Sequence, residues 1–163
     1  MASPQIAPSL SVRHQGLMMK LPDEHWVLVE GKSQGHPYFM MVNDGLKHFP
    51  GKSEYSYCLI AVIELDDMQG HRLPTNEEAE VLYKIEDILI DDLSQVTLPI
   101  QIGRETYFGE REILIYFPEI PNYKSIVDSI SQKTNLLRPT HIEFHHDPSW
   151  KQATRYLGVQ QNA

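Results

Sequence analysis

The sequence predicts an α+β domain built on an antiparallel sheet that carries its helices on one face. The chain has 163 residues, of which 41% are apolar, and this is enough to bury the core of one domain. A long helical pattern over residues 76–93 and a shorter one after Pro121 each lie between strand-like apolar runs. The expected order is two strands followed by β-α-β-β-α-β. We assign residues 23–163 to a single domain and residues 1–22 to a flexible lead-in.

The first two strands are predicted to form a hairpin. They run from Trp26 to Glu30 and from Tyr38 to Asn43, and Gly31 and Gly35 separate them. The next strand, Tyr55 to Leu65, is apolar on both faces. Such a pattern indicates a central strand that is covered on both sides.

A helix is predicted to begin at Asn76. Pro74 cannot continue a preceding strand, and Thr75 followed three residues later by Glu78 matches a capping box. Apolar residues then recur at the helical period; they are Val81, Leu82, Ile85, Ile88, Leu89 and Leu93. Asp92 interrupts this stripe, so it lies either in a frayed last turn or beside a buried partner.

The second half of the domain is predicted to contain two strands, a helix and a last strand. The two strands are Val96 to Tyr107 and Glu110 to Phe117, joined by a tight turn, and a helix begins at Asn122. The last strand runs from His141 to His146. With right-handed crossovers, this order is the split β-α-β arrangement of ferredoxin-like folds, with the N-terminal β-hairpin added.

Composition narrows the classes of partner. The net charge of −8 and the absence of a basic stripe argue against nucleic acid as a ligand. No apolar run has the length of a membrane span or the pattern of a signal peptide. The single cysteine, Cys58, lies in an apolar run and is expected to be a small buried side chain. We therefore expect a cytoplasmic protein without a membrane partner.

The long helix carries most of the net charge. Seven carboxylates and one lysine lie between Asn76 and Asp92. The residues expected on its outer side, where a partner would meet them, are Glu77, Glu80, Asp87 and Asp91. They form either a solvated face or a recognition surface for a basic partner, because a concentrated field of one sign steers association.

Three stretches carry a resemblance to a known family. They are Trp26 with Gly31, the run P-T-N-E-E-A-E-V-L-Y-K-I-E-D at Pro74 to Asp87, and T-Y-F-G-E-R-E-I-L-I-Y at Thr106 to Tyr116. In these the chain resembles the bacterial family called domain of unknown function 695. The last strand and D-P-S-W at Asp147 to Trp150 resemble fold relatives of the regulator of ribonuclease E, inhibitor B. The resemblance implies a ferredoxin-like domain with a regulatory, protein-binding role and supplies no catalytic residues.

Arg111 and Glu112 on the predicted hairpin form a first candidate constellation with Glu86 of the long helix. If Arg111 points toward the helix, a partly buried pair with Glu86 would fix the helix against the sheet. If Arg111 points to the open face, it is available to a ligand. We favour the structural pair.

The last strand contains the second candidate. Because side chains alternate along a strand, His141, Glu143 and His145 project from one face. Two imidazoles and a carboxylate suit a divalent metal. Neighbours on one face are about 7 Å apart at Cα, however, so a metal would need ligands from an adjacent strand. An ordinary polar strand is the favoured interpretation.

The third candidate is the motif of Asp147 and Trp150. Asp147 before Pro148 is typical of a helix start, with the aspartate as N-cap. Trp150 is then expected to cover an edge of the core. The alternative is an aromatic anchor for a partner.

These observations leave two classes of function. The favoured one is a non-catalytic, cytoplasmic protein-binding or regulatory module that uses its acidic helix or the open face of its sheet, with an immunity or antitoxin protein as a special case. That open face needs cover from the N-terminal hairpin, a partner or a second copy, as in a homodimer. The alternative is a small metal- or ligand-binding enzyme built on Arg111, Glu112 and the histidine strand. We expect no cofactor.

Overall fold

The computed structural model describes residues 20–158, which form an α+β domain around a six-stranded sheet. The strand order is β1-β2-β6-β7-β3-β8, and every pairing is antiparallel. The strands are β1 (Trp26–Ser33), β2 (His36–Asn43), β3 (Tyr57–Glu64), β6 (Ile100–Tyr107), β7 (Glu110–Phe117) and β8 (Thr140–His146). The helices are α2 (Asn76–Ser94), α3 (Tyr123–Asn135) and α4 (Thr154–Leu157).

Short elements fill the connections. A two-stranded ribbon of β4 (Met68–Gln69) and β5 (Leu73–Pro74) precedes α2. Single 3₁₀ turns occur at η1 (Asp44–Leu46), η2 (Lys52–Glu54) and η3 (Gly70–Arg72). Most of the lead-in assigned to residues 1–22 lies outside the described residues, although Leu21 packs against the core.

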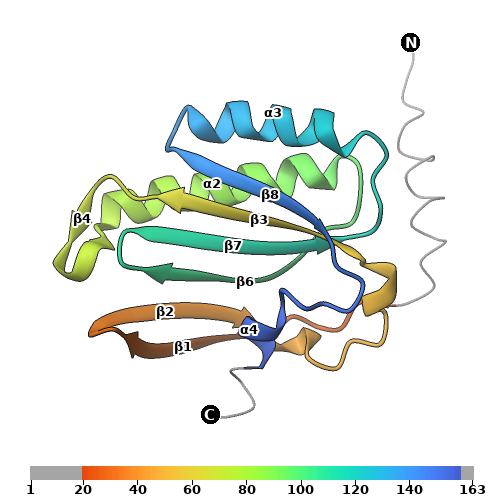
Figure 1. Cartoon of the computed structure of the whole chain (residues 1–163), viewed down its shortest axis with the longest axis horizontal. Coiled ribbons are helices and arrows are strands. Elements are labelled where there is room, and N and C mark those ends of the chain that lie inside the picture. Colours follow the sequence, from red (N-terminus) through yellow and green to blue (C-terminus); the bar gives the residue numbers. More distant parts are fainter. Residues whose placement is uncertain (1–19, 159–163) are drawn as a thin grey trace.

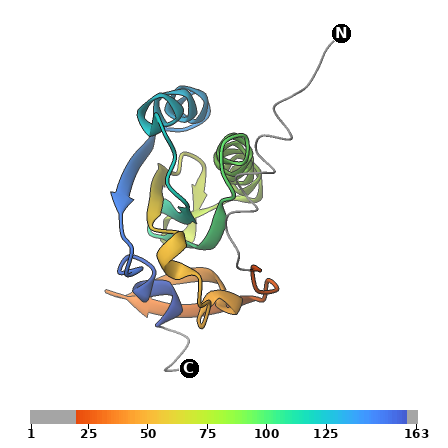
Figure 2. The same cartoon turned by 90° about the vertical axis from the view of Figure 1, so that its right-hand side faces the viewer.

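The sheet separates two apolar layers (Figures 1 and 2). The long helices α2 and α3 lie side by side on one face, here called the α2 face, whereas α4 lies on the opposite α4 face. Alternation along β7 serves both layers, because Ile113 and Ile115 pack beneath α2 while Leu114 and Tyr116 pack toward α4. The central strands are therefore covered on both sides, at least in part.

The N-terminal hairpin extends the sheet. β2 pairs with β6, so β1 becomes an edge strand and the hairpin does not fold over the open face. Cover for the α4 face comes instead from the C-terminal turn and the segment between β2 and β3, which supply Trp150, Tyr156, Leu46 and Phe49 to one cluster.

Two predicted elements begin several residues later than expected. The strand expected from Val96 begins at Ile100, because the last turn of α2 continues through backbone hydrogen bonds from Val96 and Thr97 to Leu93 and Pro99 follows. The helix expected from Asp147 begins at Thr154, and Trp150 between them adopts a positive φ of 57°. Residues 148–149 and 151–153 form turns instead.

β6 contains a bulge that decides which side chains face α2. Gln101 pairs with Ile115 and Gly103 with Leu114, so Ile102 is the extra residue. Gln101 and Arg104 consequently share the α2 face although three positions separate them. A Cβ at Gly103 would lie 2.5 Å from the carbonyl oxygen of Met41 and 2.8 Å from the Tyr156 ring, which is why the bulge needs glycine here.

None of the helices within residues 20–158 combines the length and the apolar character required to cross a membrane.

Candidate functional site

The carboxylates of α2 divide into an inward and an outward set. In the inward set, Glu78 is fully buried and accepts hydrogen bonds from Nε and Nη2 of Arg138, the shortest at 2.5 Å. The amide of Asp66 donates to the same carboxylate at 2.8 Å. The hydrogen bonds from Arg138 lower the pKa of Glu78 although burial opposes them. Glu78 thus fastens the first turn of α2 to the segment before β8.

Glu86 faces the sheet from the middle of α2 and is 8% exposed. Nη1 of Arg104 lies 2.9 Å from its Oε1, and Nε2 of Gln101 donates to its Oε2 at 2.9 Å. The expected partner, Arg111, makes no hydrogen bond with Glu86 in the described residues; Arg104 takes that place. Sequence reasoning missed Gln101 and Arg104, because strict alternation without the bulge would put them on opposite faces.

Asp92 belongs to the last turn of α2 and has a partner. Its Oδ2 lies 2.8 Å from Nζ of Lys133 on α3, so the residue that interrupts the apolar stripe joins the two long helices. Both groups are partly solvated, and the pair contributes little to stability on its own.

The outward set consists of Glu77, Glu80, Asp87 and Asp91, all exposed. They follow one another at spacings that keep them, with Lys84, on a single side of α2, which we call the outer stripe. None of the four forms an ion pair with another residue between 20 and 158. The four carboxylates of the outer stripe therefore lack an ion-pair partner in the described part of the chain, in contrast to Glu78, Glu86 and Asp92.

Arg111 points to the α2 face and is 7% exposed. Its Nε donates to Thr106 Oγ1 at 2.9 Å, while its buried Nη1 has no hydrogen-bond partner. The ring of Tyr83 on α2 covers both guanidinium groups, with its centroid 5.4 Å from Cζ of Arg111 and 5.2 Å from Cζ of Arg104. Burial lowers the pKa of Arg111, and the charge of Arg104 lowers it further.

Glu112 lies on the opposite, α4 face. It accepts hydrogen bonds from Nη1 of Arg155 at 2.9 Å and from the hydroxyl of Tyr156 at 2.8 Å, and Arg155 also pairs with Glu105. Burial and the charge of Glu112 raise the pKa of Tyr156 well above its usual value. Arg111 and Glu112 are neighbours in the chain but cannot act on one ligand, since the sheet separates them.

The histidine strand shares the α4 face with Glu112. His141 pairs with Val62 in the register of β3 and β8, and Val62 pairs with Glu112. Glu143 lies between the imidazoles, with its oxygens 3.1 Å from Nε2 of His141 and 2.9 Å from Nε2 of His145. These hydrogen bonds, first that of His145, lower the pKa of Glu143. No metal-binding cluster of three or more His, Cys, Asp or Glu side chains is found in residues 20–158.

Asp147 and Trp150 lie in the core of the C-terminal turn. Asp147 Oδ2 accepts a hydrogen bond from the Tyr116 hydroxyl at 2.6 Å, and its two oxygens accept from the amides of Lys151 and Gln152. Trp150 is 3% exposed, stacks on Tyr116 at 4.4 Å and donates from Nε1 to the carbonyl of Tyr55 at 2.8 Å. Both side chains are committed to packing, so Trp150 is not free to anchor a partner in this conformation.

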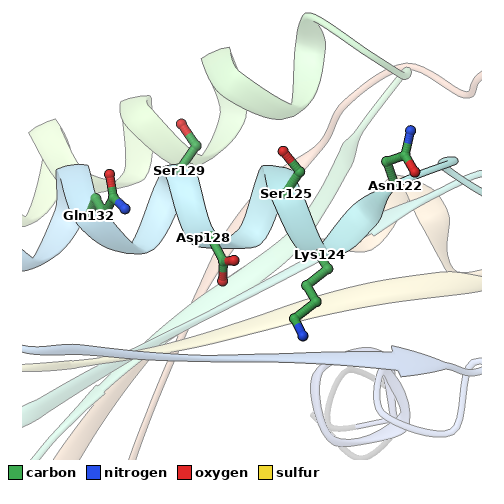
Figure 3. A pocket seen from close by; sticks show the side chains of 6 residues that line it. All are labelled: Asn122, Lys124, Ser125, Asp128, Ser129 and Gln132. Carbon is green, nitrogen blue, oxygen red and sulfur yellow. The ribbon is translucent and has the colours of Figure 1, made fainter.

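A hollow of about 690 Å³ lies along the outside of α3 (Figure 3). Its lining residues are Asn122, Lys124, Ser125, Asp128, Ser129 and Gln132. All six are exposed and come from α3 or its N-cap, with Ser125 and Ser129 on one side of the helix and Lys124 and Asp128 on another (Figure 3). Without a second wall, this surface depression lacks the converging groups of a binding site.

Comparison with known proteins gives one match. A family model described as "Family of unknown function (DUF695)" matches residues 24–157, which include all six strands of the main sheet and all three α-helices. No curated protein and no solved structure matches the chain. The residues matched cover most of the sequence, and the chain therefore belongs to the family of unknown function DUF695.

Proposed function

We propose that this protein is a non-catalytic, cytoplasmic protein-binding or regulatory module, and that a basic surface of its partner binds the outer stripe of α2. The observation that supports this most directly is the division of the α2 carboxylates. Glu78, Glu86 and Asp92 have cationic partners within the fold, whereas the four of the outer stripe have none among the described residues. A helix needs no such charge to fold, so these groups remain available for long-range attraction.

We further propose a ferredoxin-like core for the domain. The order β6-β7-β3-β8, with α2 between β3 and β6 in sequence and α3 between β7 and β8, supports this classification. The resemblance to fold relatives of the regulator of ribonuclease E, inhibitor B, in which such a domain binds proteins, favours the same role. It supports the proposal by analogy only.

The α4 face offers a second place for a partner or for a second copy of the chain. Ile60 and Val62 on β3 are only partly buried there, although Ile60 packs against the cluster beneath the C-terminal turn, and Glu112 and Glu143 flank them. An apolar centre with a charged rim is typical of protein interfaces.

The enzyme hypothesis receives less support from the geometry. Its proposed components, Arg111 on one side and Glu112 with the histidine strand on the other, lie on opposite faces of the sheet. A shared reaction centre would require them to converge on one substrate.

The first prediction concerns the outer stripe. Neutralising Glu77→Gln, Glu80→Gln, Asp87→Asn and Asp91→Asn together is expected to abolish capture, from the native lysate at low salt, of a protein that the wild type retains. Screening by salt should release the same protein from the wild type. Mass spectrometry of the eluted fractions identifies it.

A matched variant removes the same charge elsewhere. It neutralises four exposed carboxylates that make no ion pair within the described part of the chain, and these are Glu30, Glu54, Glu110 and Glu119. This control should retain the partner. If both variants retain the partner equally, the proposed role of the outer stripe is wrong. If both lose the partner equally, binding depends on the net charge of the protein and not on the outer stripe.

A further inference from the structure

Arg111 is a buried cation with an unfilled hydrogen-bond donor. The side chain is more than nine-tenths enclosed, Nε is satisfied by Thr106, and Nη1 has no acceptor. Buried polar groups are almost always hydrogen-bonded, because an unmade bond leaves the desolvation penalty uncompensated. A group that is left unpaired in such a place is a reason to look for a ligand.

A second arginine lies beside it. The guanidinium groups of Arg104 and Arg111 contact the same ring of Tyr83. Within residues 20–158, Glu86 is the one carboxylate that pairs with either arginine, and it is already bound by Arg104 and Gln101. The cluster therefore carries two positive charges against one negative charge. This local excess is opposite in sign to the net charge of the protein.

Tyr83 covers the cluster without being fixed in the core. It is 45% exposed on the side of α2, next to the outer stripe. Rotation of an exposed side chain needs no change in the backbone and is fast. Beyond Tyr83, the partly buried Phe39 and Met41 of β2 are register partners of Thr106 and Arg104 and so line the same face.

We propose that Arg104 and Arg111 form a binding site for a compact oxyanion, the phosphate or carboxylate group of a small ligand, which enters when the Tyr83 ring swings aside. Two oxygens of such a group match the forked donors of a guanidinium, and Nη1 of Arg111 would gain the acceptor that it lacks. Glu86 competes with the ligand for Arg104. This site lies between α2 and the sheet and is independent of the outer stripe.

The test follows the Arg111 Nε–H and Tyr83 ring signals by NMR during titration with inorganic phosphate or with acetate. Chloride at matched ionic strength serves as the reference. Saturable shifts with phosphate, with acetate or with both are expected, and the stronger of the two identifies the source of the oxyanion. Identical shifts with phosphate, acetate and chloride would mean that the shifts arise from ionic screening, and this would contradict the proposed binding site.

Variants separate the site from general anion binding. Arg111→Met is expected to abolish the saturable shift of the Tyr83 signals. Glu86→Gln, which keeps an acceptor but removes the competing charge, should tighten binding at least about fivefold. Arg72→Met is the matched control, because Arg72 also lies against an aromatic ring, that of Phe108, but is exposed; it should leave the affinity unchanged.

Tyr83 provides a readout that does not depend on the stability of the arginine variants. Tyr83→Ala opens the cluster and should raise the affinity several-fold, whereas Tyr83→Phe keeps the cover and should not. Unchanged affinity in Tyr83→Ala would contradict the proposal. Unchanged affinity in Glu86→Gln would contradict it as well.

Discussion

Asp147 is the carboxylate that fastens the C-terminal turn to the sheet. Burial alone would raise its pKa, but the hydrogen bonds from Tyr116 and from the amides of Gln152 and Lys151 outweigh burial and lower it. A folded-state pKa below the unfolded value stabilises the protein above the unfolded pKa, which is about 4 for aspartate. This stabilisation is lost as the pH falls through the folded pKa.

The second prediction follows from this linkage. Asp147→Asn is expected to lower the free energy of unfolding at pH 7 by about 1–3 kcal/mol and to make it less sensitive to acid below pH about 4. Urea unfolding at several pH values measures both effects. Asp128→Asn, on the exposed side of α3, should leave the curve unchanged. A wild-type acid dependence in Asp147→Asn would contradict the assignment.

Individual site residues differ in how well sequence could place them. Strand alternation was enough to put His141, Glu143 and His145 on one face, where they lie. It failed for Arg104, because the bulge at Ile102 changes the alternation within β6 and the sequence shows only a glycine at Gly103. Pairing of Glu86 with Arg104 instead of Arg111 depends on that one inserted residue.

At the scale of elements, α2 was the most predictable part of the chain. Its apolar period and Thr75 located the first residue, and Thr75 Oγ1 accepts a hydrogen bond from the amide of Glu78 at 3.2 Å. The capping box is nevertheless incomplete. The Glu78 side chain binds Arg138 and Asp66, while the amide of Thr75 donates to Asp67, because a guanidinium fork binds a carboxylate more strongly than one amide does.

The third prediction compares two roles within this helix turn. Glu78→Gln is expected to destabilise the fold by about 2–3 kcal/mol, since it removes the charge of a fully buried carboxylate and leaves the partly exposed guanidinium of Arg138 without its charge partner. Thr75→Ala should cost about 1 kcal/mol, the usual value of an N-cap. Glu77→Gln, exposed and one residue away, should stay within about 0.5 kcal/mol. Denaturant unfolding of the three variants ranks them, and a larger loss in Thr75→Ala than in Glu78→Gln would refute this order.

At the scale of the whole molecule, the sheet lies between two apolar layers that arise from different kinds of sequence pattern. The helix layer is built from periodic sequence and was expected. The layer on the α4 face is assembled from residues far apart in the chain, such as Phe49, Tyr116 and Trp150, in turns that have no periodicity. Long-range packing of this kind leaves little local signal, which explains why the sequence predicted only that Trp150 covers an edge of the core and did not predict which segments cover this face.

The last prediction tests whether the two layers unfold together. Trp150→Ala removes a buried ring and its hydrogen bond to Tyr55, so the free energy of unfolding should fall by about 3–5 kcal/mol. The variant keeps Trp26 at the far edge of the sheet as its only tryptophan. Because β7 contributes side chains to both layers, Trp26 fluorescence and far-UV circular dichroism should report one shared transition at lower denaturant. Two separated transitions would mean that the α4 face is a detachable layer; Trp26→Phe, with Trp150 as the reporter, provides the reciprocal measurement.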